Sequence, residues 1–361
     1  MVFHMGSGLE GEKGVHSGLK ELGVKVTQKR VRDALKVFYN RPGKERRAII
    51  RRVYHVPFIN SLWHIDGHHK LGPWGIVIHG AIDGFSRRIM YIFVADNNRA
   101  STVLSAFLRA TEKYGWPSRV RADLGKENWE VKAQMEKVRG LNRGSFIQGP
   151  STHNQRIERL WVDIQQWSTA RYRQQFIYYE EQGYLCRDDP LEMWALHFVY
   201  IPTLRKALEF FVERWNNHGI PTEKNSTPVQ LWHRNLRAAE KIQLSPIQHV
   251  DPLTGYLEDH YDDPDAAKRF EDYGVDHFKG RSGHQLNDND PHKKTPAILS
   301  SLPEDVRAML ESLEFRQRIE EVAGDDRWTW PPPADFGLER YLTVVQEVNR
   351  IVRQEFPALY S

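Results

Sequence analysis

The stretch that organises the chain reads Gly149-Pro-Ser-Thr-His-Asn-Gln-Arg-Ile-Glu-Arg-Leu-Trp161. A glycine and a proline interrupt the backbone at its start, and the Ser151 or Thr152 hydroxyl is a suitable cap for the N–H groups that follow. Apolar residues then recur at helical spacing as far as Ile164. The pattern predicts a long helix with Glu158 on its first turns. A single helical glutamate is usually only solvated, so its meaning depends on the acids that the fold brings to it.

The sequence upstream of this stretch predicts a sheet. Three short runs are rich in Ile, Val, Phe, Tyr and Trp and are separated by turn residues; they cover residues 62–69, 75–83 and 88–94. Their short connections predict an antiparallel meander. A helix is expected over 99–114 and a strand over 119–122, and a strand reached across a helix is expected to be parallel to its neighbour. This order places Asp66 on the first strand and Asp123 directly after the fourth.

These blocks together resemble the catalytic core shared by retroviral integrases and DDE transposases. The matching blocks are Trp63-His-Ile-Asp66, Ile82-Asp-Gly-Phe-Ser-Arg87, residues 117–125 and residues 149–161. By this resemblance Asp66, Asp123 and Glu158 match the three catalytic acids in order, and the last two have close to the family's spacing. The resemblance implies an α/β fold of the RNase H-like class, a mixed five-stranded sheet flanked by helices, with helical extensions at both ends.

The resemblance also implies a cofactor and a reaction. Carboxylates converging from different elements suit Mg²⁺, or Mn²⁺, and the family holds two ions that activate the attacking oxygen and stabilise the leaving one. We therefore expect a transposon-derived, metal-dependent polynucleotidyl transferase that cuts a DNA end and joins it to target DNA. Two alternatives stay open: a domesticated DNA-binding scaffold without activity, and an RNase H-like nuclease that cuts without joining. Each acid taken alone could also be a turn or helix-start residue.

Several other residues near the acids need an interpretation. Asp83 is the strongest competing acid, and the Asp-Gly pair predicts a structural turn. His64, His68 and His69 flank Asp66; a histidine metal site is conceivable, but the family pattern favours strand-surface or DNA-facing groups. The glycine-rich segment 140–149 is expected to move over a substrate. Four tryptophans are expected to pack in the core rather than against bases: Trp161, Trp167, Trp215 and Trp232.

Basic residues predict contact with DNA. Residues 18–38 are similar to the last two helices of a helix-turn-helix unit, with Thr27 as the cap of a basic second helix, although a solvated basic helix would look alike. Basic density continues over 41–52. The candidate DNA contacts are Lys29, Arg30, Arg32, Lys36, Arg46, Arg47, Lys126, His153, Asn154, Arg156 and Arg159. For Lys126 a solvated side chain is an equal alternative.

Composition limits the class of protein. The chain has 361 residues, 40% of them hydrophobic and 27% charged, with a net charge of +4. It has no apolar run near the ~20 residues of a membrane span and no pattern of a secretory signal, so no membrane partner is expected. The single Cys186 excludes an internal disulfide framework and a zinc site built from several cysteines. An intracellular and specifically nuclear location is expected.

The chain is expected to fall into four parts: a tail over 1–16, a basic segment over 17–52, the catalytic core over 53–235, and a region of unknown role over 236–361. An apolar helix is expected over 191–215, with Pro202 as a point where it could break. The acidic cluster within 258–265 lacks the ligand spacing of an EF-hand and predicts a solvated loop.

Two amphipathic helices are expected over 303–323 and 336–356. This end of the chain does not resemble the barrel that ends retroviral integrases, and the cysteine count excludes their zinc-bound N-terminal domain. Integrases work as multimers, so the resemblance implies a homo-oligomer.

Overall fold

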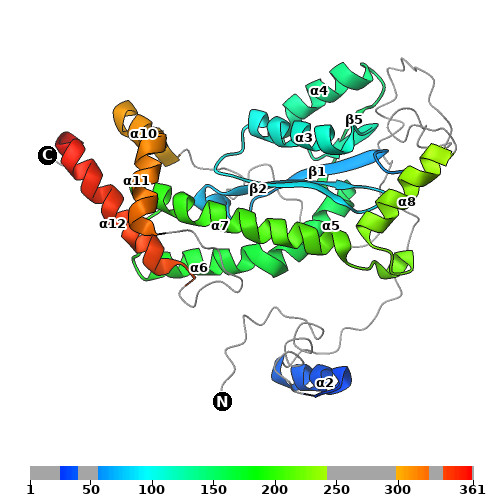
Figure 1. Ribbon diagram of the computed structural model, residues 1–361, viewed down its shortest axis with the longest axis horizontal. Helices are drawn as coiled ribbons and strands as arrows, with labels where there is room; N and C mark the ends of the chain where they lie inside the picture. Colours follow the sequence, from blue (N-terminus) through cyan, green and yellow to red (C-terminus); the bar gives the residue numbers. More distant parts are fainter. Residues whose placement is uncertain (1–24, 40–55, 242–297, 325–335, 360–361) are drawn as a thin grey trace. The chain divides into compact units, whose positions relative to one another are not determined.

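The computed structural model describes residues 25–39, 56–241, 298–324 and 336–359 (Figure 1). The chain divides into two compact units, residues 1–52 and 53–361. The described part of the first unit is helix α2 (Gln28–Tyr39), where the Arg30 N–H donates to the Thr27 hydroxyl at 3.4 Å. Thr27 is therefore the cap that the sequence predicted. The first helix of the expected helix-turn-helix pair lies outside the described residues.

A mixed five-stranded sheet forms the centre of the second unit, with strand order β3-β2-β1-β4-β5. The strands are β1 (Leu62–His68), β2 (Val77–Asp83), β3 (Ile89–Ala95), β4 (Arg119–Ala122) and β5 (Phe146–Gln148). The first three are antiparallel neighbours, whereas β4 runs parallel to β1 and β5 parallel to β4. This topology confirms the predicted meander, the crossover and the RNase H-like class.

Strand β5 lies inside the segment that was expected to be a mobile loop. Phe146 and Ile147 are buried, and β5 pairs with the edge of β4. The loop prediction was wrong for these residues, because three residues carry too little pattern to announce a strand. Gly140 and Gly144 do have positive φ angles, of 93° and 66°, so backbone turns precede β5.

Helices cover both faces of the sheet (Figure 1). On one face lie α3 (Ala100–Tyr114) and α4 (Trp129–Arg139), which bury Phe107 and Met135 in one apolar cluster with residues of the sheet. On the other lie α5 (Gln155–Ile164) and α7 (Pro190–Asn217). The alternation of side chains along each strand supplies both cores. Within the described ranges, no helix combines the length and apolarity needed to cross a membrane.

Helix α5 continues through a π-helical segment, η4 (Gln165–Thr169), into α6 (Ala170–Glu181). The long helix that the sequence predicted is thus present, but its cap differs. Ser151 and Thr152 belong to a separate 3₁₀ turn, η3 (Ser151–His153), and Asn154 occupies the cap position of α5. Further single turns are η1 (Gly72–Trp74), η2 (Lys126–Asn128), η5 (Pro221–Glu223), η7 (Ile298–Ser301) and η8 (Pro357–Leu359).

Helix α7 runs for 28 residues without interruption at Pro202. Proline removes one helical hydrogen bond, but residues along the whole helix are buried in the core, so packing offsets the loss. Helix α8 (Pro228–Lys241) follows and buries Trp232 against the Tyr114 ring.

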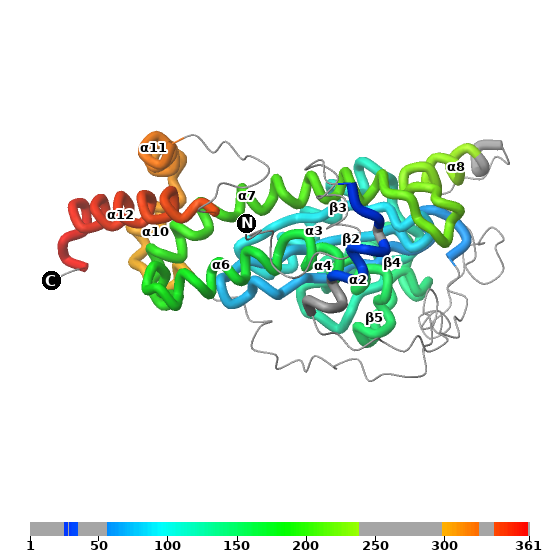
Figure 2. Tube along the Cα trace, turned by 90° about the horizontal axis from the view of Figure 1, so that it is seen from below, coloured from blue at the N-terminus to red at the C-terminus, as the bar shows by residue number. Residues whose placement is uncertain are grey.

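Three C-terminal helices pack at the other end of α7 from α8 (Figure 2). They are α10 (Glu304–Glu311), α11 (Leu313–Ala323) and α12 (Leu338–Glu355). The single helix expected over 303–323 is divided at Ser312, whose backbone is extended and whose hydroxyl accepts a hydrogen bond from the Phe315 N–H at 3.2 Å. Tyr341 of α12 stacks on Tyr179 of α6 with ring centroids 5.6 Å apart. The expected acidic loop within 258–265 lies outside the described residues.

Candidate active site

Asp66 lies on β1, where its backbone pairs with Gly80 of β2. Its Oδ2 atom accepts a hydrogen bond from the Trp161 indole N–H at 2.7 Å. Burial, followed by the charges of Asp123 and Glu158, raises the pKa of the Asp66 carboxyl well above its usual range. The charges of Asp123 and Glu158 therefore act on Asp66, which places the three predicted acids within electrostatic range of one another.

Asp123 follows β4 directly and is buried. Its Oδ1 atom accepts hydrogen bonds from the Gly125 N–H at 2.9 Å and from the Asn128 amide at 3.3 Å. Asp123 therefore occupies a strand-end turn, and its charge also acts on Asp66. The sequence allowed two roles for Asp123, a turn residue and a catalytic acid, and these roles are compatible.

Glu158 lies on the first turn of α5, and its side chain is half-buried. The donor set of three carboxylates is the one that a hard divalent cation requires. Within the described ranges, however, no group of three or more His, Cys, Asp or Glu side chains is arranged closely enough to hold a metal ion. Asp66 and Asp123 each direct an oxygen to protein donors instead.

Asn154 joins the start of α5 to β1. Its amide donates to the Ile65 carbonyl at 2.8 Å, and its Oδ1 lies 2.8 Å from His64 Nδ1. Burial lowers the pKa of His64 to about 3, so the ring is neutral at pH 7 and Nδ1–H is the donor to Asn154. Asn154 is only 1% exposed. This burial opposes the prediction that Asn154 contacts DNA, because the side chain bonds inside the protein.

His64 and His68 are buried, so the prediction that these two side chains lie on the strand surface or face DNA was wrong. The His68 ring stacks on Trp161 with centroids 5.2 Å apart, and its Nε2 lies 3.2 Å from the Thr169 hydroxyl. Burial lowers the pKa of His68 to about 3. His69, which directly follows β1, is half-buried.

Comparison with known families identifies an integrase core domain over residues 53–244, just over half of the chain. The chain belongs to the integrase core domain family. The HTLV-2 integrase catalytic core domain, solved with magnesium in a trimeric form, is 16% identical, with a TM-score of 0.34 over 50% of this chain and 100% of the viral one. The simian T-cell lymphotropic virus intasome, solved with the PP2A regulatory subunit B56 gamma, is 16% identical, with a TM-score of 0.37 over 68% and 80% of the two chains. A comparison with curated proteins finds no match.

The other candidate DNA contacts of this integrase core are distributed unevenly. Lys126 is exposed in η2, beside Asp123. Arg159 is exposed and forms an ion pair with Asp163 at 2.8 Å, whereas His153 and Arg156 are half-buried. In the separate first unit, Lys29, Arg30 and Arg32 are exposed on α2. The Lys36 side chain, Arg46 and Arg47 lie outside what the structure describes.

Two features beside the integrase site were missed at the sequence level. Leu124 and Trp129 are 62% and 59% exposed on either side of Lys126, an unusual position for large apolar side chains. Arg121 of β4 is fully buried, and its charge, together with that of Arg156, contributes to the low pKa of His64 after burial itself. The sequence around Arg121 gives no signal that an arginine in a short strand is buried. Trp129 could have been noticed, because it lies six positions after the candidate acid Asp123.

Asp83 has the structural role that the sequence predicted. It is fully buried, and it accepts hydrogen bonds from the N–H groups of Asn60 and Ser86 at 2.8 and 2.7 Å and from the Ser86 hydroxyl at 2.7 Å. Burial raises its pKa to about 6. Asp83 therefore closes the turn between β2 and β3 and is not one of the clustered acids.

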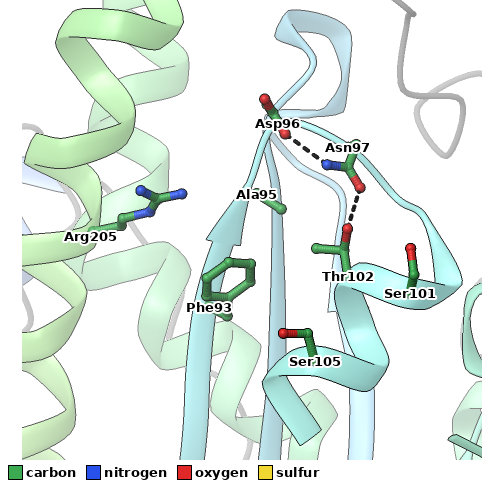
Figure 3. Close-up of a pocket in the computed structure, with 8 residues that line it drawn as sticks. All are labelled: Phe93, Ala95, Asp96, Asn97, Ser101, Thr102, Ser105 and Arg205. Carbon is green, nitrogen blue, oxygen red and sulfur yellow. Dashed lines mark hydrogen bonds between the residues drawn. The ribbon is translucent and has the colours of Figure 1, made fainter. Parts of the chain in front are cut away.

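A cavity of about 340 Å³ lies where β3 leads into α3, and Arg205 of α7 borders it (Figure 3). The Arg205 guanidinium donates to the Val94 carbonyl at 2.9 Å, and the Asn97 Oδ1 accepts from the Thr102 hydroxyl at 2.8 Å. The polar groups of this cavity are thus engaged in holding β3, α3 and α7 together. None of its lining residues is a candidate catalytic or DNA-binding residue of the core.

Proposed function

We propose that this integrase-core protein is a metal-dependent DNA polynucleotidyl transferase, which hydrolyses a phosphodiester and joins the freed 3′-hydroxyl to a second DNA. The observation that supports the proposal is the electrostatic effect of Asp123, directly after β4, and Glu158 of α5 on Asp66 of β1. Carboxylates that come from three separate elements are a typical ligand set for divalent cations.

These three carboxylates would hold Mg²⁺ or Mn²⁺. Bound there, two such ions would make the attacking oxygen more nucleophilic and stabilise the charge on the leaving oxygen. The protein's contribution is to hold the carboxylates in place: Trp161 holds Asp66, the Gly125 and Asn128 donors hold Asp123, and Asn154 fixes the start of the helix that carries Glu158. A cation would also relieve the repulsion that raises the pKa of Asp66, so its binding and the ionisation of the site are coupled.

The DNA partner is proposed from the basic groups near the acids. Lys126 and Arg159 are exposed, and positive charges at such places bind phosphates without reading sequence. The expected homo-oligomer and the nuclear location stay predictions.

The test uses the full chain with end-labelled duplex DNA, a supercoiled plasmid target, and Mg²⁺ or Mn²⁺. Asp66→Asn, Asp123→Asn and Glu158→Gln should each reduce nicking and joining by ~10²-fold or more, because metal-mediated charge stabilisation amounts to several kcal/mol. DNA affinity, measured by fluorescence anisotropy, should stay near that of the wild type. Glu181→Gln is the control, since Glu181 is an exposed acid at the end of α6.

The outcomes separate the proposal from its alternatives. Undiminished nicking by all three variants would refute it. DNA binding by the wild type without any metal-dependent cleavage would indicate the scaffold. Free cleaved ends without joined products would indicate a nuclease.

A further inference from the structure

Trp161 forms a hydrogen bond to the candidate site through its indole nitrogen. Its indole N–H donates to Asp66 Oδ2 at 2.7 Å, and the side chain is only 5% exposed. Trp161 lies three positions after Glu158 on α5, and residues at that spacing share one side of a helix. One turn of α5 therefore carries a proposed metal ligand and also the donor that contacts a second ligand on β1.

The indole ring is held on two sides. A Cβ atom on Gly80, the residue opposite Asp66 in the sheet, would lie 2.7 Å from Trp161 Cη2, so the ring occupies space that only glycine leaves open. The His68 ring stacks on the indole with an interplanar angle of 23°. His68 itself is bonded to Thr169, which lies at the end of the π-helical segment η4. The widened helical turn thus takes part in fixing the ring, and such turns are frequent at functional sites.

We propose that Trp161 is a positioning residue for Asp66: its N–H holds Oδ2 in one orientation, and the lone pairs that neither the indole nor the Gly67 backbone uses are left for a divalent cation. An ionised carboxylate has about four acceptor sites, and the indole uses one of them. Groups that bond to metal ligands fix their orientation, and losing one weakens metal affinity ~10- to 100-fold. The inference rests on the proposed function, because it assigns Asp66 as a ligand.

The alternative is that Trp161 only fills the core, since it belongs to the same buried apolar cluster as Ile78 and Leu160. Trp161→Phe distinguishes the two roles, since it keeps an aromatic ring and removes the N–H. The matched control is Trp74→Phe, because Trp74 is 3% exposed and donates its own indole N–H to Glu180 Oε1 at 2.8 Å, away from the three acids. Each variant replaces one buried indole and loses one hydrogen bond from an indole N–H to a carboxylate.

The first readout is Mn²⁺ binding to the full chain without DNA, followed by electron paramagnetic resonance of the free ion. Trp161→Phe should weaken Mn²⁺ binding at least tenfold, and Trp74→Phe should leave it within twofold of the wild type. Nicking by Trp161→Phe should recover as Mn²⁺ is raised to saturation. Replacement of Trp161 by 3-benzothienylalanine, which has the same bicyclic shape without an N–H, should reproduce the weaker Mn²⁺ binding with near wild-type unfolding.

The results distinguish this inference from the proposed function. Asp66→Asn should abolish Mn²⁺ binding, which establishes the ligand. If it does so while both Trp161 variants bind Mn²⁺ like the wild type, Trp161 is core packing and only the positioning role fails. If the wild type itself binds no Mn²⁺, the metal site and the positioning role fail together.

Discussion

Asn154 should behave as a buried anchor between α5 and β1, and Asn154→Ala tests this. The substitution removes two hydrogen bonds of 2.8 Å, to the Ile65 carbonyl and from the His64 ring. Loss of a buried partner costs ~1–3 kcal/mol per group, so with two groups the free energy of unfolding should fall by ~2–6 kcal/mol. That is a large part of the ~5–15 kcal/mol that stabilises a typical domain.

Urea unfolding of the full chain, followed by tryptophan fluorescence, measures the change from the shift in midpoint. Thr152→Ala is the control, because Thr152 is exposed in the turn just before Asn154 and its loss should change stability by less than ~0.5 kcal/mol. DNA affinity is measured on the folded variants at one fixed salt concentration.

A particular combination of results would refute the reasoning about Asn154. If Asn154→Ala unfolds within ~0.5 kcal/mol of the wild type while its DNA affinity falls tenfold, the side chain contacts DNA and not the protein interior. The opposite combination, with lowered stability and nearly unchanged DNA affinity, is the expected result.

Two further residues give predictions of other kinds. The pKa of Asp83 is about 6 in the folded chain against a usual 3.8, so the folded state holds this proton more tightly, and stability is lost as pH rises from about 4 to 6. At ~1.36 kcal/mol per pH unit, the free energy of unfolding of the wild type relative to that of Asp83→Asn should fall by ~2 kcal/mol between pH 4 and pH 7 in urea unfolding, and a constant difference would contradict this. Trp129→Ala should weaken single-stranded DNA binding by ~5-fold or more, because stacking of one base on an aromatic ring contributes ~1–3 kcal/mol. Val138→Ala, which changes another exposed apolar residue of α4, should leave DNA affinity unchanged, and equal effects of the two would exclude stacking.

The sequence predicted the parts of the fold that carry their own periodicity. Strands β1 to β4 are short runs rich in β-branched and aromatic residues or alternating, and α3 ends at a glycine, so local pattern sufficed to place Asp66 and Asp123. Helical spacing placed Glu158 in the same way, and the resemblance gave all three acids their expected role. Strand β5 escaped detection because its existence depends on the edge of β4 and not on its own three residues. Helix α4 escaped because it buries only Val131 and Met135 and leaves its first residue, Trp129, exposed.

The surroundings of the acids could not be predicted, because burial depends on contacts between distant segments. His64 and Asn154 are both polar, and each alone is typical of a surface. They become interior residues only because α5 packs across β1, which satisfies both side chains at once. For the same reason Trp161 was expected to be plain core: nothing in the sequence shows that its one polar atom meets Asp66.

The C-terminal helices α10 to α12 determine whether the integrase core of this chain can be cut out as a separate fragment. The family match ends at residue 244, yet Phe315 packs on Trp194, and Phe336 on Tyr172, with ring centroids 5.5 and 5.1 Å apart. A fragment cut where the homology stops would expose these aromatic rings of α6 and α7 to water. In this chain the family match therefore ends before the hydrophobic core does, and a domain boundary placed at residue 244 would divide a single core.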